Sequence, residues 1–176
     1  GRCVSSSIRR NFRSVILRFP LVPKTRSILR LPQKMNRNPL YLLDTSVYCQ
    51  PLKRKPLEAV VERWKTVGDS GCRISVFCEM EVLQGLHTAG SAKLFHLFER
   101  VLKDRIASLP FTAEEAAVYA ELKAGALRGG NTRPVIDLCI AATALRHGLV
   151  LATLNVKDFR GIPGLRVEDW GRPGSD

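Results

Sequence analysis

The sequence lacks a hydrophobic run that approaches the ~20 residues needed to span a bilayer. Its longest largely apolar run, Leu138 to Leu145, is short enough to be a helix in a protein core. With 176 residues, 45% hydrophobic and 25% charged, the chain is long enough for one compact domain and too short for two ordinary ones. These features exclude a membrane-spanning protein and predict a single globular domain.

Cysteine and histidine patterns that bind zinc are absent as well. The five cysteines include no CxxC pair, and the three histidines are scattered along the chain. The odd number of cysteines and their apolar neighbours favour buried, reduced thiols and therefore a cytoplasmic protein. Aromatic residues make up only 7% of the chain, and no segment interleaves them with basic residues as a base-stacking surface does.

Acidic residues are missing from the first 34 positions, which hold nine of the 28 Lys and Arg residues. The remaining chain has 19 basic residues against 16 acidic ones, so its net charge is +3, although the whole chain carries +12. That residual charge does not by itself argue for nucleic acid. An Arg- and Ser-rich, acid-free start resembles a transit peptide, but the first methionine is Met35. We predict a disordered basic leader over 1–36, outside the native protein, and a folded domain over 37–172.

Short apolar runs alternate with segments of helical periodicity. Strands are expected at 40–43, 72–77, 105–111, 149–153 and 164–170. Helices are expected at 56–71, 78–86, 92–103, 112–130 and 135–148. The alternation predicts an α/β fold whose mostly parallel sheet is covered by helices on both faces. In such sheets, ligands bind beyond the carboxyl ends of the strands.

Polar side chains occur where the predicted strands reach that edge, or where a helix begins beside it. In chain order they are Asp44, Glu81, Asp137, Asn155 and Asp158. Each acid alone could be a helix cap or a solvated charge that the helix dipole favours, and for a single acid these are the commoner roles. Asn155 could equally serve a turn.

Several carboxylates at one edge of the sheet need a compensating positive charge or raised pKa values. Two carboxylates about 4 Å apart repel by about 4 kcal/mol at an effective dielectric constant near 20. A counter-cation or raised pKa values must offset that cost. Oxygen ligands with open positions suit Mg²⁺, or Mn²⁺, together with a substrate phosphate. The pattern therefore indicates metal-assisted phosphodiester chemistry.

Four stretches carry a family resemblance: "YLLDTSV", "EVLQG", "VIDLCIAATALRHGLVLATLNVKDF" and "PGLRVEDW". They resemble the PIN domain, in particular VapC-family toxins, from about Leu40 to Trp170. The resemblance implies a three-layer α/β/α fold with a central, mostly parallel sheet. It also implies a Mg²⁺-dependent endoribonuclease that serves as the toxin of a type II toxin–antitoxin pair.

The resemblance further implies which residues act. The family's first three acids fall on Asp44, Glu81 and Asp137, which are expected to be catalytic metal ligands, whereas Glu79 is out of register. The fourth catalytic position, often Asp in the family, falls on Asn155. Asn155 carries no charge, and the nearby Asp158 could supply it. A single Mg²⁺ is expected, with a second recruited by the RNA phosphate.

Supporting roles are expected for hydroxyls and for one basic loop. Thr45 and Thr153 are placed to orient the carboxylates. The run Lys53, Arg54 and Lys55 lies just past the first acid and could bind the RNA backbone. A solvated loop or an antitoxin contact explains that run equally well.

The expected partners are an RNA substrate, a cognate antitoxin and a second copy of the chain in a homodimer, with DNA reached only through the antitoxin. The alternative is a catalytically weak PIN-like module that acts mainly by binding its antitoxin. Three retained acids argue against it, because a scaffold has no need of their mutual repulsion. A phosphatase of similar architecture would carry a DxD pair, whereas Asp44 is followed by Thr45 and Ser46.

Overall fold

A computed structural model describes residues 40–130 and 132–172, and the leader predicted over 1–36 lies outside them. Five strands form one sheet in the order β3-β2-β1-β4-β5, and every neighbouring pair is parallel. The strands are β1 (Tyr41–Leu43), β2 (Cys72–Ser75), β3 (Ser108–Leu109), β4 (Val150–Thr153) and β5 (Val167–Asp169). The expected parallel sheet is confirmed.

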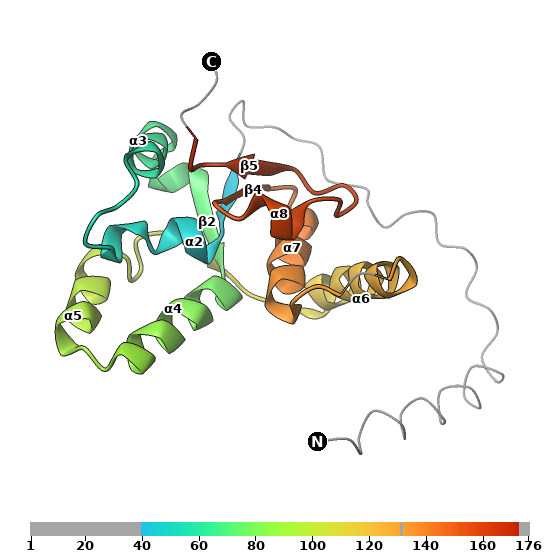
Figure 1. Cartoon of the computed structure of the whole chain (residues 1–176), viewed down its shortest axis with the longest axis horizontal. Helices are drawn as coiled ribbons and strands as arrows, with labels where there is room; N and C mark the ends of the chain where they lie inside the picture. The colour runs from blue at the N-terminus through green and yellow to red at the C-terminus, as the bar shows by residue number, and fades with distance from the viewer. Residues whose placement is uncertain (1–39, 131, 173–176) are drawn as a thin grey trace. The chain divides into compact units, whose positions relative to one another are not determined.

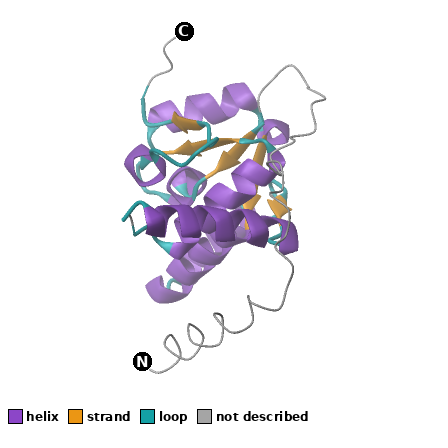
Figure 2. Ribbon diagram, turned by 90° about the vertical axis from the view of Figure 1, so that its right-hand side faces the viewer, coloured by secondary structure: helices purple, strands orange, loops and turns teal. Residues whose placement is uncertain are grey.

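Helices connect the strands and lie on both faces of the sheet (Figures 1 and 2). They are α2 (Thr45–Tyr48), α3 (Glu58–Val67), α4 (Val76–Ala89), α5 (Ala92–Val101), α6 (Ala113–Arg128), α7 (Val135–His147) and α8 (Val156–Phe159), with 3₁₀ turns at Gln50–Leu52 and Asp69–Gly71. Parallel connections are right-handed, so those that run in opposite directions across the sheet cover opposite faces. The expected three-layer α/β/α fold is confirmed.

Two predicted element boundaries are wrong for identifiable reasons. The helix expected from residue 56 begins at Glu58, because the backbone N–H of Leu57 donates to Gln50 Oε1 (3.0 Å). The strand expected over 72–77 ends at Ser75, whose hydroxyl accepts from the N–H of Cys78 (3.2 Å) and caps α4. At Ser75 the cap starts a helix and so ends the strand, whereas at Leu57 the Gln50 side chain binds a backbone N–H that has no partner within the helix.

The helix predicted over 56–71 also ends earlier, at Val67, and the one predicted over 78–86 extends over Val76–Ala89. Further differences concern very short elements. The strand expected over 105–111 contains only Ser108 and Leu109, since the following Pro110 has no N–H to donate to a sheet. The four-residue helices α2 and α8 were not predicted, because four residues are too few to show helical periodicity. These two helices nevertheless carry part of the candidate site.

The core lies where β1 and β4 pack against α7. Leu42, Leu43 and Leu151 are fully buried, as are Ile140 and Ala141 of α7. The small residues of α7 let this helix approach the sheet closely, which fixes the position of its first turn at the sheet edge. In the part of the chain that the structure describes, no helix has both the length and the apolar character needed to cross a membrane.

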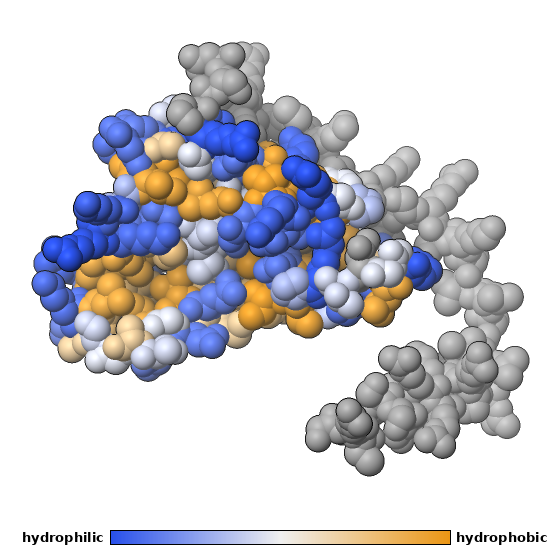
Figure 3. All heavy atoms as spheres, in the orientation of Figure 1, coloured by the Kyte–Doolittle hydropathy of each residue, from blue (hydrophilic) through white to orange (hydrophobic). Residues whose placement is uncertain are grey.

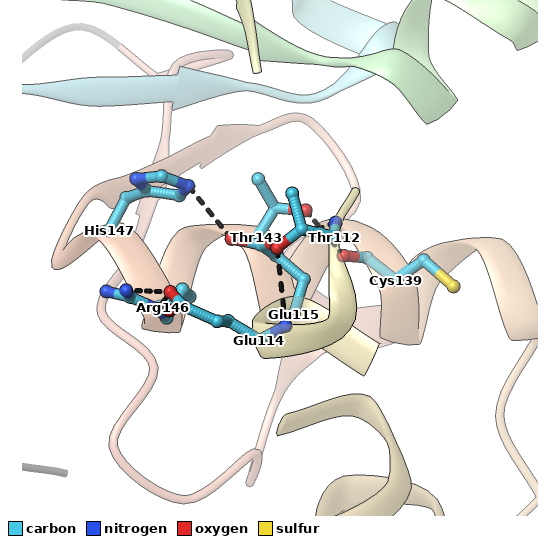
Figure 4. A network of polar contacts seen from close by, with 7 residues as sticks. All are labelled: Thr112, Glu114, Glu115, Cys139, Thr143, Arg146 and His147. Carbon is cyan, nitrogen blue, oxygen red and sulfur yellow. Dashed lines mark hydrogen bonds and ion pairs between the residues drawn. The ribbon is translucent and has the colours of Figure 1, made fainter. Parts of the chain in front are cut away.

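Polar contacts hold α7 against α6 (Figure 4). Glu115 Oε2 accepts from the N–H of Thr112 (2.7 Å), which confirms a capping box at the start of α6. Glu115 Oε1 lies 3.2 Å from His147 Nε2 of α7, and Arg146 of α7 pairs with Glu114. Burial raises the pKa of Glu115, but the hydrogen bonds from Thr112 and the charge of His147 outweigh it and lower the pKa below 4.5.

Replacing this buried acid should weaken the fold without touching the candidate site. We expect Glu115→Ala to lower the free energy of unfolding by about 1–2 kcal/mol at pH 7, because it removes a cap and a buried partner of His147. Since folding lowers the pKa of Glu115, the loss should shrink as the pH falls below 4.5. Urea unfolding measures it, and the exposed Glu114→Ala is the control, with an expected loss below about 1 kcal/mol. Equal losses in the two variants would contradict the assignment.

Candidate active site

The site begins at the point where the chain leaves β1. From β1 the chain moves to β2 and β3 on one side and then returns to β4 on the other. The N–H of Asp44 donates to the carbonyl of Ala152 (2.9 Å), so the residue after β1 is still fastened to β4. A crevice at such a switch in strand order is the usual ligand site of an open α/β sheet.

Two hydroxyls bind the carboxylate of Asp44. Its Oδ2 accepts from Ser46 Oγ (2.6 Å) and from Thr153 Oγ1 at the end of β4 (2.8 Å). Asp44 is 7% exposed, and Thr153 is fully buried. Asp44 stands at the N-cap position of α2, yet its side chain makes no capping hydrogen bond within the described residues. The carboxylate is therefore held across the sheet edge rather than used as a helix cap.

Glu81 reaches the same edge from the second turn of α4. Its Oε2 accepts from Thr45 Oγ1, the hydroxyl next to Asp44 (2.5 Å). Glu79 lies two residues earlier, about 200° around the helix. Burial and then the charge of Glu79 raise the pKa of Tyr48 to about 12, which places Glu79 beside a different side chain. The predicted register, with Glu81 toward the edge, agrees with these contacts.

Asp137 completes the group from the first turn of α7, where it is partly buried. Burial raises the pKa of Asp137 to about 6, and the negative charges of Asp44, Asp158 and Glu81 add to the rise. The charge of Arg133 acts in the opposite direction. The charges of Asp44, Glu81 and Asp158, which come from three other segments, therefore all act on Asp137.

The region of the fourth catalytic position is formed by the turn after β4 and by α8, and it is called the fourth side of the site below. The N–H of Asn155 donates to Thr153 Oγ1 (2.9 Å), and the Asn155 side chain is exposed. Asp158 lies in the first turn of α8, and its charge acts on Asp137. The structure brings both candidates for the fourth position to this edge, and only Asp158 adds charge to it.

The family model for the PIN domain matches residues 41–165. The chain belongs to the PIN domain family. The tRNA(fMet)-specific endonuclease VapC of Salmonella typhimurium is 29% identical over 130 residues, which cover 74% of this chain and 97% of that protein. Toxin FitB of Neisseria gonorrhoeae is 29% identical over 126 residues, covering 68% of this chain and 91% of that protein. The DNA-bound VapBC structure from Salmonella typhimurium has a TM-score of 0.67 at 29% identity and covers 76% of this chain and 99% of that one.

The resemblance to VapC proteins that the motifs indicate is thereby confirmed. The matched region, 41–165, falls inside the domain predicted over 37–172. Every acid that the motifs single out lies within the matched region.

The donor set of this PIN domain fits a hard divalent cation. All of its charged groups are carboxylates, and their mutual repulsion is what a cation would relieve. Within residues 40–130 and 132–172, no three His, Cys, Asp or Glu side chains are grouped closely enough to hold one metal ion together. Mg²⁺ does not require such a group, since it keeps several waters and binds through one or two carboxylates. Two of the carboxylates here are hydrogen-bonded to hydroxyls instead.

The basic run of this PIN domain lies near the acids. Lys53, Arg54 and Lys55 are exposed and follow the 3₁₀ turn after α2. Burial raises the pKa of the Cys49 thiol, the charge of Lys53 lowers it, and the charges of Asp44 and Glu81 raise it. Lys53 and the acids therefore act on one thiol, so the basic loop borders the site. Binding of RNA by this loop stays a prediction.

Sequence reasoning missed two residues of the site. Ser46 Oγ donates to Asp44 and also accepts from the N–H of Leu154 (3.0 Å), so it joins the ends of β1 and β4. The signal was the Asp-x-Ser spacing, in which a hydroxyl two residues on can turn back to the carboxylate. Arg133 was also missed, because an arginine before a proline in a loop has no distinctive pattern.

Ser46 offers a prediction of its own. We expect Ser46→Ala to lower metal-dependent RNA cleavage by about 10–100-fold, because one of the two hydroxyl donors that orient the Asp44 carboxylate is lost. Ser70→Ala, a change of exposed serine in the Asp69–Gly71 turn, is the control. Initial rates with a fluorescent RNA measure the effect. Equal rates for both variants would show that Ser46 does not orient Asp44.

Proposed function

We propose that this chain is a metal-dependent endoribonuclease. The observation that carries the proposal is the environment of Asp137: burial raises its pKa to about 6, and the charges of Asp44, Asp158 and Glu81 add to the rise. The relatives support it, because one that this chain covers to 97% of its length is named as an endonuclease. Hydrolysis of an RNA phosphodiester bond is the chemistry that joins an oxygen-only metal site to a phosphate substrate.

Asp44, Glu81 and Asp137 would hold Mg²⁺, or Mn²⁺ in its place. When bound, the cation lowers the pKa of a water and neutralises charge on the phosphoryl oxygens. The protein's own hydroxyls fix the carboxylates: Thr45 holds Glu81, and Ser46 and Thr153 hold Asp44. Because these hydrogen bonds join separate elements, the acids are oriented before any substrate arrives.

The fourth side and the basic loop would serve the RNA. Asn155 is exposed next to Thr153 and can donate to a substrate oxygen, while Asp158 adds negative charge beside Asp137. Lys53 and its two basic neighbours would bind the RNA backbone on the other side of Asp44. In-line attack of water on the phosphorus would leave 5′-phosphate and 3′-hydroxyl ends.

In the cell, we propose that the chain is the toxin of a toxin–antitoxin pair. One relative is named Toxin FitB, and one similar solved structure is VapBC bound to DNA. A cognate antitoxin would bind this chain and carry any contact with DNA. The four cysteines among the described residues are free and three of them are buried, which suits the reducing cytoplasm in which such a pair would work.

An apolar surface is available for protein partners. A groove of about 820 Å³ runs along α5 and is lined by Ser91, Lys93, Leu94, His96, Leu97 and Arg100. Figure 3 shows apolar side chains gathered over this corner of the molecule, and Met80 of the adjoining α4 is 42% exposed. We propose that this surface serves the homodimer or the antitoxin. Light scattering of the purified chain, alone and with antitoxin, measures which complex forms.

The decisive experiment is RNA cleavage by the purified chain with Mg²⁺ and with EDTA. We expect cleavage with Mg²⁺, its loss with EDTA and its recovery when excess Mg²⁺ or Mn²⁺ is added back. Asp44→Asn, purified in parallel, controls for a contaminating ribonuclease. Binding of an antitoxin without any metal-dependent cleavage would instead establish the alternative, a PIN-like module that acts as a binding partner.

A further inference from the structure

The charge of Arg133 acts on Asp137 and opposes the rise of its pKa. It precedes Pro134, the N-cap residue of α7. A residue before proline is confined to extended backbone, so Arg133 cannot join the helix and its side chain leaves the chain just outside the first turn. Asp137 lies four residues further on, inside that turn.

The guanidinium group of Arg133 binds the backbone at the end of α8. Nη1 donates to the carbonyl of Asp158, and Nη2 donates to the carbonyl of Arg160 (2.5 Å). Carbonyls at the end of a helix have no partner within the helix, and a planar guanidinium can satisfy two of them at once. On its other side the segment is anchored by Phe159, which is 2% exposed. One side chain thus ties the start of α7 to the end of α8.

These two helices carry two acids of the candidate site. The start of α7 holds Asp137, and α8 holds Asp158 and follows Asn155. Asp137 and Asp158 repel each other, and a four-residue helix has little hydrogen bonding of its own to resist that repulsion. Both terminal nitrogens of Arg133 donate to carbonyls, which leaves this residue poorly suited to bind an RNA phosphate.

We propose that Arg133 is a positioning residue that holds α8, with Asn155 and Asp158, against Asp137 and so completes the fourth side of the site. The metal-binding and catalytic part of this inference rests on the proposed function. The link that the Arg133 hydrogen bonds make between α7 and α8 does not depend on the proposed function.

The test compares Arg133→Lys and Arg133→Met with the wild-type chain. Lysine keeps the charge but cannot bridge two carbonyls, whereas methionine loses both the charge and the bridge. Arg128→Met, at the exposed end of α6, is the matched control. Three quantities are measured: hydrogen exchange over 155–162, the dissociation constant of Mn²⁺, and kcat and KM for RNA cleavage.

If Arg133 positions α8, both variants should exchange hydrogen faster over 155–162. They should also bind Mn²⁺ about 10–100-fold more weakly and lose kcat with little change in KM. If Arg133 acted through its charge alone, Arg133→Met should bind Mn²⁺ more tightly than the wild type, because removing a positive charge favours a bound cation. Arg133→Lys should then behave like the wild type. A role in binding RNA predicts a change in KM alone. Either result overturns the proposal.

Failure of the proposed function gives a different result. If the wild-type chain cleaves no RNA, Mn²⁺ affinity and hydrogen exchange still decide the role of Arg133. If it binds no Mn²⁺ either, faster exchange over 155–162 in both variants supports the tie, and unchanged exchange refutes it. Loss of melting temperature alone, with unchanged exchange and Mn²⁺ affinity, would leave Arg133 as an ordinary structural residue and refute the proposal.

Discussion

Asp44→Asn, Glu81→Gln and Asp137→Asn should each abolish Mg²⁺-dependent RNA cleavage and leave the protein folded. Changes to groups that merely orient metal ligands cost about 10–100-fold, so loss of a ligand itself should cost on the order of 100-fold or more. Rates with a fluorescent RNA at saturating Mg²⁺ measure this loss. Glu79→Gln is the matched control on the same helix, because Glu79 lies beside Tyr48, and it should stay active.

Stability separates this role from a structural one. Removing one of several mutually repelling acids should raise, or at least not lower, the melting temperature of the metal-free protein. Loss of a helix cap would instead cost about 1 kcal/mol and leave catalysis intact. Variants at Asp44 and Asp137 that remain active but are destabilised would refute the metal site. Asn155→Asp should keep its activity and bind the metal more tightly.

Asp137 should also make the metal-free protein less stable as the pH rises. Its pKa is about 6 when folded and 3.8 ordinarily, so between these values the folded state binds more protons than the unfolded state. The free energy of unfolding therefore falls as the pH rises through this window, and the penalty is fully present above pH 6. A pKa rise from 3.8 to about 6 corresponds to at most about 3 kcal/mol, which solvent screening of this partly exposed group reduces to roughly 1 kcal/mol.

Urea unfolding in EDTA, compared between the wild type and Asp137→Asn, measures the effect. The variant should gain about 1 kcal/mol on the wild type between pH 4 and pH 7. Because protons compete with the metal for Asp137, the affinity for Mn²⁺ should fall by about tenfold per pH unit below pH 6 in the wild type. A stability difference that does not change with pH would mean that folding does not raise the pKa of Asp137.

The order of the elements was predictable because each long one carries a local signal. Helix α7 has a proline before its start and a glycine after its end, and α6 has the Thr112 and Glu115 capping box. The short helices α2 and α8 carry no such signal. They form because tertiary contacts fix their ends, as when the N–H of Leu154 binds Ser46 Oγ or Arg133 binds the carbonyls after α8.

The acids of the site were predictable for a related reason. A charged residue directly after an apolar strand, as at Asp44, or in the first turn of an apolar helix, as at Asp137, interrupts a local pattern and can be seen in the sequence. A hydroxyl residue or an arginine in a loop interrupts no apolar pattern. The role of Arg133 depends on a carbonyl 25 residues away, and the bond from the Leu154 N–H to Ser46 spans 108 residues, so only the folded chain reveals these two contacts.

By itself the sequence determined the α/β class and the approximate place of each long element, because these follow from hydrophobic periodicity and local capping. The choice of Glu81 over Glu79 came from the family resemblance. Only the tertiary structure decided the strand order, with β1 between β2 and β4, and hence which ends share a crevice. It also decided that Asp44 is bound by Ser46 and Thr153 rather than used as a cap. Packing of distant segments chooses among partners that are locally equivalent, and no local pattern contains that choice.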